Sequence, residues 1–214
     1  MSKTTWLVCA TVCILWVLTI LPVAAQDVPP GVRSDAIGIG FFYLSPDAPL
    51  EAGAGFRLGY SHRFDRRRLS VKTGLSLTSL DREAEGIAQA GQIDLWILSA
   101  GVLWAVGPRS SAWTLNVGGG LDLVDGDGEG SFAVPGPIAI QNTFDVDLSA
   151  GLHADFDAIR ALGQRWQISL GLRYLAATVD GAHRFVVDGV EGAPLPVDFE
   201  IGGPQLAIGF DYRF

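Results

Sequence analysis

Cysteine is almost absent from this chain of 214 residues, because its only two cysteines, Cys9 and Cys13, lie within the first 25 positions. The rest of the sequence has no thiol, which excludes a disulfide framework and a thiolate metal site. Basic residues are also few, with 15 Lys and Arg against 23 Asp and Glu. A chain with a formal net charge of −8 lacks the basic surface that a phosphate backbone requires, so nucleic acid is excluded as a partner.

Long apolar runs are missing after residue 25, which excludes a membrane-spanning helix in the rest of the chain. The first 25 residues differ, because Lys3 precedes an apolar run, Trp6–Ile20, and the small residues of Val23-Ala24-Ala25 follow it. This order predicts a secretory signal peptide that is removed before Gln26, with an uncleaved inner-membrane anchor as the alternative. The predicted divisions are a signal peptide at 1–25, a lead at 26–34 and one folded domain at 35–214.

The sequence is rich in alternating apolar and polar residues. The last ten residues set an apolar series against a polar one: Leu206, Ile208, Phe210, Tyr212 and Phe214 against Gln205, Ala207, Gly209, Asp211 and Arg213. Successive side chains of a strand point to opposite sides, so this is a strand with one apolar face. Seven earlier segments repeat the pattern: 37–43, 56–61, 69–78, 93–106, 113–123, 144–157 and 166–178.

Two of these segments have a face assignment that the structure can test. The segment 93–106 is apolar on both faces, and we assign Trp96 and Trp104 to the outside and Ser99 to the inside. The segment 144–157 alternates without a break, which places its aromatic and aliphatic residues outside and its Asp residues inside.

The connections between the segments alternate in length. Short ones fall at 65–68, 107–112 and 158–165, and long ones at 45–53, 81–92, 125–143 and 179–204. Short turns at one end and long loops at the other predict an all-β, eight-stranded antiparallel up-and-down transmembrane β-barrel. A water-soluble barrel of the lipocalin kind would need the opposite faces. Glycine, serine and opposed charges suit a narrow interior, and apolar outer faces would aggregate in water.

The ending Tyr212-Arg213-Phe214, on an alternating strand, resembles the carboxy-terminal strand of bacterial outer-membrane β-barrels. The whole domain is similar to the small eight-stranded members of Gram-negative bacteria, the OmpX, OmpA-barrel and OmpW groups. The resemblance implies a monomer in the outer membrane, in contact with lipid and lipopolysaccharide. It also implies that the barrel-assembly machinery recognises the last strand, with Phe210, Tyr212 and Phe214 as the assembly signal.

Charged residues fall on the faces that we assign to the lumen. Their signs nearly balance, which predicts ion pairs that fill the interior. We expect an outer layer and an inner layer: Arg57, Arg173, Asp122 and Asp147, then Lys72, Arg213, Asp155 and Asp211. The alternative is that these charges line a water path or act as its gate.

Catalysis is a minor alternative, because the domain has only three histidines, His62, His153 and His183. His153 shares a face with Ser149, but four residues of strand place them about 13 Å apart, too far for a nucleophile and its base. A serine on a neighbouring strand, such as Ser169, would be needed instead. We therefore expect no enzyme, no catalytic residue and no cofactor.

Two segments between the strands invite a ligand. The stretch 125–130 has acidic residues at alternate positions, but glycine stands at the twelfth position, where a calcium loop needs an acid. We expect an acidic loop and no metal site. The segment 179–204 is apolar enough to continue the adjoining strands as a hairpin, or to form a binding surface.

These observations predict a non-enzymatic barrel that supports the envelope, or that binds or passes a small, hydrophobic solute. A lipid A-modifying hydrolase and a surface adhesion module are the alternatives.

Overall fold

The computed structural model describes residues 35–46, 50–64, 68–82, 90–106, 112–132, 140–187 and 189–214. Every regular element in these ranges is a strand: β1 (Asp35–Leu44), β2 (Gly53–Arg63), β3 (Leu69–Arg82), β4 (Ala90–Val106), β5 (Trp113–Phe132), β6 (Ile140–Ala161), β7 (Trp166–Val187), β8 (Val190–Glu191) and β9 (Leu195–Arg213). The signal peptide and the lead, predicted for residues 1–34, lie outside these ranges. No helix within them has the length and apolar character to cross a membrane.

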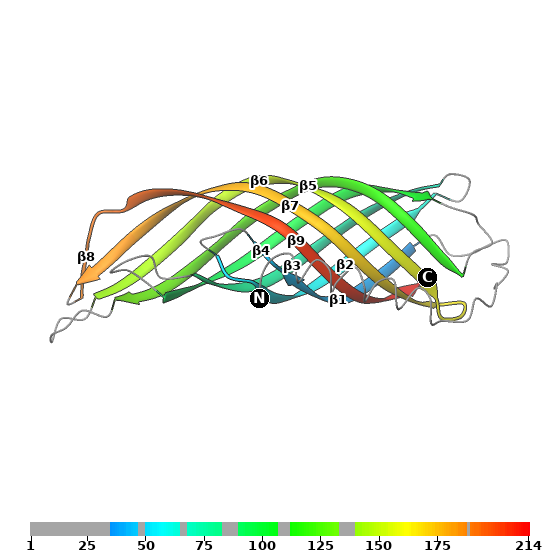
Figure 1. Cartoon of the computed structure of the whole chain (residues 1–214), viewed down its shortest axis with the longest axis horizontal. Coiled ribbons are helices and arrows are strands. Elements are labelled where there is room, and N and C mark those ends of the chain that lie inside the picture. The colour runs from blue at the N-terminus through cyan, green and yellow to red at the C-terminus, as the bar shows by residue number, and fades with distance from the viewer. Residues whose placement is uncertain are drawn as a thin grey trace.

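The eight long strands form a closed ring (Figure 1). Each strand from β1 to β7 pairs antiparallel with the next one in the chain, except that β7 pairs onward with β9, and β9 pairs with β1. The two-residue β8 adds a small hairpin to β7. The predicted eight-stranded antiparallel up-and-down barrel is therefore confirmed. We call the end with the β2–β3, β4–β5 and β6–β7 connections the inner end, and the opposite end the outer end.

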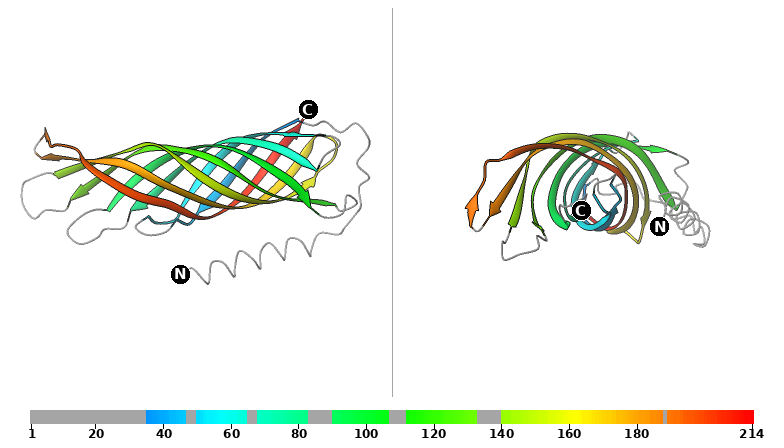
Figure 2. Two further views of the ribbon diagram at one scale, coloured as in Figure 1. Left: turned by 90° about the horizontal axis from the view of Figure 1, so that it is seen from above. Right: turned by 60° about the vertical axis from the view of Figure 1, so that its left-hand side comes forward.

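The wall of the barrel is uneven at the outer end. The strands lengthen from 10 residues in β1 and 11 in β2 to 22 in β6 and in β7. Within the described residues, β1 ends at Leu44 opposite Gln205, and beyond a hydrogen bond from the Ser45 amide to the Pro204 carbonyl the outer part of β9, residues 195–203, pairs with β7 alone. The wall is consequently low at β1 and β2 and high at β6 and β7, which gives the open profile of Figure 2.

Two long connections predicted from the sequence are mostly strand. The segment 179–204 is a hairpin, because β7 continues to Val187 and β9 begins at Leu195. Of the two alternatives for this segment, the structure therefore has the continued hairpin. The acidic stretch 125–130 is part of β5 and was wrongly expected to be a loop.

Around the inner half of the ring, apolar side chains point outward. Phe41, Leu121 and Leu152 are each more than 60% exposed, as lipid-facing residues are in an isolated chain. The orientation of β4 is the predicted one, with Trp104 52% exposed and Ser99 5% exposed.

In the outer half the two faces exchange their character. On β7, the lipid-facing Tyr174 is followed by the buried, inward Leu175, and Val179 is also buried while Asp180 is exposed. β4 and β9 change in the same way, since Ile93, Leu95 and Ile201 are buried and Gln92, Asp94, Asp198 and Glu200 are exposed. Above the lipid-facing belt the barrel therefore has a polar outside and an apolar inside.

In β6 a β-bulge produces the exchange of polar and apolar faces. The register shifts between Val146 and Gly151, because β6 has one more residue here than its neighbours require. Phe144 and Val146, expected outside, are 4% exposed and point inward, and Asp145 and Asp147 are exposed. The lumen assignment of Asp147 was therefore wrong, and its carbonyl instead accepts a hydrogen bond from the Ser149 hydroxyl at 2.8 Å.

Candidate functional site

The outer half of the lumen is filled by a cluster of apolar side chains, which we call the apolar plug. Its members come from every long strand except β2 and from the β1–β2 connection: Phe42, Leu44, Leu50, Leu80, Ile93, Leu95, Ile97, Val124, Phe144, Val146, Leu175, Ala177, Val179 and Ile201. Leu44, Leu80 and Val124 are fully buried, so the plug is shielded from solvent as the core of a soluble protein is. It was not predicted from the sequence.

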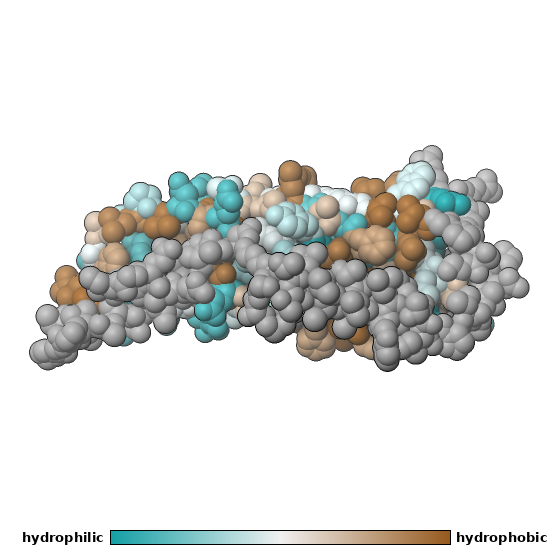
Figure 3. Space-filling view, viewed as in Figure 1, coloured by the Kyte–Doolittle hydropathy of each residue, from teal (hydrophilic) through white to brown (hydrophobic). Residues whose placement is uncertain are grey.

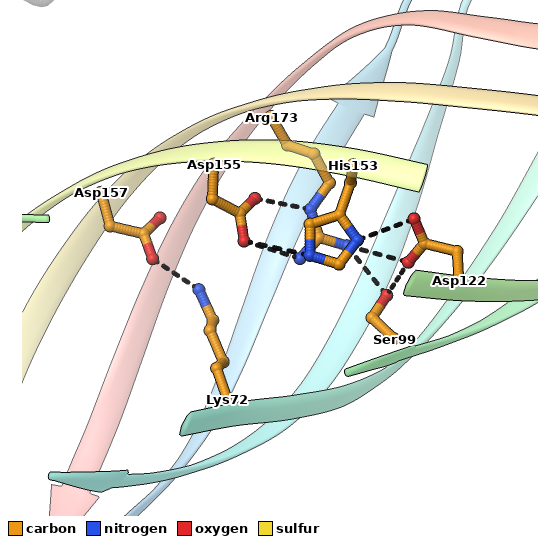
Figure 4. Close-up of polar contacts among 7 residues, drawn as sticks. All are labelled: Lys72, Ser99, Asp122, His153, Asp155, Asp157 and Arg173. Atoms are coloured by element: carbon orange, nitrogen blue, oxygen red, sulfur yellow. Dashed lines mark hydrogen bonds and ion pairs between the residues drawn. The ribbon is translucent and has the colours of Figure 1, made fainter. Parts of the chain in front are cut away.

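Below the plug lies a network of charged and polar side chains (Figure 4). Arg173 on β7 donates two hydrogen bonds to the carboxylate of Asp155 on β6, at 2.7 and 3.1 Å, and a third to the Ser99 hydroxyl at 2.9 Å. Ser99 donates to Asp122 at 2.5 Å, and the Nδ1 atom of His153 lies 2.8 Å from the other Asp122 oxygen. These five side chains, which we call the Arg173 network, come from β4, β5, β6 and β7, which are neighbours in the ring.

The antiparallel register explains why the pair forms. Asp155 and Arg173 are opposite each other on neighbouring strands, and both point inward. Residues opposite one another in an antiparallel pair have Cβ atoms about 5 Å apart, within reach of a bidentate ion pair. The sequence had placed Arg173 and Asp155 in different layers, and the structure joins them.

A second ion pair lies nearer the inner end. The Nζ atom of Lys72 on β3 donates to Asp157 on β6 at 2.6 Å, across the lumen. Asp157 was not among the predicted site residues. The sequence carried a signal for it, because it continues the inward series of β6 two positions after Asp155.

The remaining predicted lumen residues occupy the inner half. Arg57 and Asp211 line a cavity there, and Asp211 accepts a hydrogen bond from Gln167 at 3.2 Å. Arg213 lies at the inner rim and donates to the carbonyl of Gly163 at 2.9 Å. Of the eight predicted residues, seven thus occupy the lumen or its rim, and Asp147 lies outside.

The three histidines contact carboxylates or aromatic rings. The Nδ1 atom of His153 faces Asp122 and its Nε2 atom lies 3.5 Å from Asp155, with the side chain only 1% exposed. His62 bonds Asp35 at the inner rim. His183, expected in a loop, is a buried residue of β7 whose ring contacts Phe144 and Phe185. In the described part of the chain, no group of three or more His, Cys, Asp or Glu residues is arranged to hold a metal ion.

Aromatic and cationic side chains meet on the outside of the barrel at its inner end. Trp166 and Tyr212 pack edge to face with their ring centroids 5.1 Å apart, and Arg165 donates to the Tyr212 hydroxyl at 3.1 Å. Arg160 lies over the Trp113 ring at 5.8 Å. Such rings prefer the headgroup level of a bilayer. Other aromatic residues exposed on the outside of the barrel are Tyr60, Trp96, Trp104 and Tyr174.

The carboxy-terminal strand has the geometry that its pattern indicates. Phe210 and Phe214 are each 50% exposed on the lipid-facing side, and the amide of Phe214 donates to the carbonyl of Asp35, which ties the end of the chain to β1. Recognition of this strand by the assembly machinery stays a prediction. On the face drawn in Figure 3, apolar side chains gather over the inner part, at the right, and several hydrophilic ones lie over the outer part.

An antiparallel ring of eight strands with an apolar outer belt and a polar inner lumen defines the fold of a small Gram-negative outer-membrane β-barrel. No protein-family model matches the chain, and no curated protein matches it. Among solved structures it is similar to the outer membrane protein OprG from Pseudomonas aeruginosa, at 14% identity and a TM-score of 0.67, over 88% of this chain and 99% of that one.

Two further structures have the same fold. Neisserial surface protein A is 14% identical with a TM-score of 0.56, over 86% of this chain and 99% of that one. A major outer membrane protein from Thermus thermophilus is 13% identical with a TM-score of 0.56, over 85% of this chain and 100% of that one. This fold, together with the lipid-facing belt, places the protein in the outer membrane.

Proposed function

We propose that the protein is a non-enzymatic, non-conducting outer-membrane barrel that binds a small apolar solute within its outer half. The observation that carries the proposal is the exchange of faces. Above the lipid belt, the wall turns polar side chains to water and lines its interior with the apolar plug. An apolar solute gains by leaving water for such an interior, by about 25 cal/mol per Å² of apolar surface buried.

The filling of the lumen supports a barrel that does not conduct ions. The apolar plug has no polar groups that could replace the hydration shell of an ion. The charges of the Arg173 network are paired with one another. An apolar solute within the plug would also stop at this network, because entering it would separate ion pairs in a poorly hydrated space.

The low wall at β1 and β2 supplies the route for a solute. Tyr43 points to the lipid side of β1, and the next residue, Leu44, is a fully buried member of the plug. The interior of the outer half thus comes closest to the lipid belt beside β1, where β9 has no described β1-side partner beyond the Ser45–Pro204 hydrogen bond.

Binding of the fluorescent apolar probe N-phenyl-1-naphthylamine to protein in nanodiscs tests the proposal. We expect saturable binding, and Val179→Asp should weaken it at least tenfold because a charge then lies inside the plug. Thr178→Asp is the matched control, since the side chain at this neighbouring position is exposed on the polar outer wall. Equal binding by the two variants, with both barrels folded by the heat-shift gel, would contradict the proposal.

Two measurements address the alternatives. Discrete conductance steps in a planar bilayer would refute a non-conducting barrel. A change in lipid A mass on expression would support the hydrolase alternative, against which the carboxylate neighbours of His153 argue.

A further inference from the structure

A cavity lies in the inner half of the lumen, below the Arg173 network. It plays no part in the binding of an apolar solute that is proposed above. Small and polar residues of β1, β2, β3, β7 and β9 make up most of its lining, and the centres of water molecules can occupy about 60 Å³ of it. One water needs roughly 10–15 Å³ in this measure, so the space suits a ligand of about four to six non-hydrogen atoms.

The floor of the cavity is made of glycine. Gly40 on β1 lies opposite Arg57 on one side and Gly209 on the other, and Gly38 lies opposite Gly59 and Asp211. All four glycines point into the lumen and line the cavity. The patch is therefore three strands wide, Arg57 and Asp211 start from diagonally opposite corners of it in the register, and the Asp211 carboxylate lies over Gly38.

Arg57 and Asp211 differ from the other lumen charges because neither belongs to an ion pair. Arg57 makes no hydrogen bond or ion pair with any residue that the structure describes, whereas Lys72 and Arg173 both have carboxylate partners. Among the described residues, Asp211 accepts a hydrogen bond from the neutral amide of Gln167 and has no cation within ion-pair distance.

This arrangement selects among small polar ligands by charge. An anion at Arg57 would be repelled by Asp211 and Asp157, and a cation at Asp211 would be repelled by Arg57 and Lys72. A ligand that carries both charges a few ångströms apart satisfies both corners. We propose that the cavity binds a small zwitterion of the α-amino-acid class, with its carboxylate on Arg57 and its ammonium group on Asp211.

The rest of the lumen sets the direction of access and the size limit. The Lys72–Asp157 pair is part of the cavity wall and the Arg173 network lies beyond it toward the outer end, so the ligand enters and leaves at the periplasmic end. The volume admits glycine or alanine and excludes a leucine side chain. This site is separate from the apolar plug, and neither proposal depends on the other.

Isothermal titration of glycine into protein purified from outer membranes and held in nanodiscs tests the site. We expect glycine to bind, and acetate, methylammonium and leucine to bind at least tenfold more weakly. Arg57→Gln and Asp211→Asn should each weaken glycine binding about tenfold or more, because each removes one charge-assisted contact.

Gly59→Leu is the steric test, since it leaves every charge in place. A Cβ atom at Gly59 meets only the carbonyl of Thr73, at 3.5 Å, so the new side chain fits the fold and fills the cavity. Leu58→Val, a change to the lipid-facing neighbour, is the control. Loss of glycine binding in Gly59→Leu with binding kept in Leu58→Val supports the site. Unchanged binding in Gly59→Leu, absence of glycine binding by the unaltered protein, or equal binding of acetate would overturn it.

Discussion

The inner half of the barrel keeps charges inside and apolar side chains outside, whereas the outer half does the reverse. Inside the inner half lie Lys72, Asp155 and Arg173, and the residues of its outer wall are lipid-facing. Inside the outer half lies the apolar plug, behind exposed acids such as Asp94 and Asp180. The same eight strands thus follow two opposite rules within one chain.

The difference follows from what surrounds each half. A lipid-facing wall buries its apolar side chains in hydrocarbon over a band about 25 Å tall, and its narrow interior is left to polar groups that pair with one another. A wall that rises into water has no hydrocarbon outside, so its apolar side chains must pack inside, as in a soluble barrel. The level at which the faces exchange, near Tyr174 on β7, therefore marks the outer boundary of the membrane.

The largest effect is expected where the two halves meet on β7. Arg173→Ala leaves the buried carboxylate of Asp155 without its cation, which should lower the free energy of unfolding by about 3–5 kcal/mol. Leu175→Ala, two residues outward, should cost about 2–5 kcal/mol through a cavity in the plug. Urea titrations followed by tryptophan fluorescence measure both.

A second substitution separates these two mechanisms. Asp155→Asn removes the orphaned charge, so it should restore much of the stability lost in Arg173→Ala and none of that lost in Leu175→Ala. Additive losses in the pair Arg173→Ala and Asp155→Asn would mean that the inner half is not held by this ion pair.

Cysteine labelling can test the exchange of faces at single residues of β6. The only cysteines of the chain lie at positions 9 and 13, so single cysteines introduced into β6 report without interference. A membrane-impermeant maleimide added outside should label Asp145→Cys and Asp147→Cys at least tenfold faster than Val146→Cys, which is buried in the plug. Val146→Cys should cost only about 1 kcal/mol, because cysteine is a small hydrophobe.

Faster labelling of Val146→Cys than of Asp145→Cys and Asp147→Cys would mean that β6 alternates without a break and has no bulge. Labelling of all three positions at one rate would mean that the outer half of β6 is not packed against a core.

The fold could be predicted from the sequence because period two is a strong signal where one face meets lipid. The eight strands, the antiparallel order and the orientation of Trp96 and Trp104 on β4 all followed from it. The outer half could not be predicted in this way, because β6 keeps its alternation through the bulge and nothing in the pattern marks the extra residue. The unused signals were the two apolar faces of β4 and the shift of apolar positions after Tyr174.

The sequence predicted which charged residues lie in the lumen, but it did not predict which of them pair. Arg173, Asp155 and Asp122 were identified as lumen charges from the polar face of their strands, but Ser99, His153 and Asp157 complete the contacts. A partner across the lumen depends on register and strand tilt, which one sequence does not contain. The same reason hid the glycine floor, since Gly38, Gly59 and Gly209 come together only through the register of β1 with β2 and β9.

The smallest effect compares two glycines on one face of β2, one in each half. A Cβ atom at Gly55 would lie 2.3 Å from the Phe42 ring and 2.5 Å from the carbonyl of Leu77, so Gly55→Ala should destabilise the barrel by about 1–3 kcal/mol through overpacking. At Gly59 a methyl group points into the cavity, and Gly59→Ala should be neutral or stabilising by about 0.4–1 kcal/mol, because it restricts the unfolded chain. Urea midpoints of the two variants measure the difference directly. A loss at Gly59 as large as at Gly55 would mean that the inner half is packed as tightly as the plug, and a glycine-floored ligand site could not then exist.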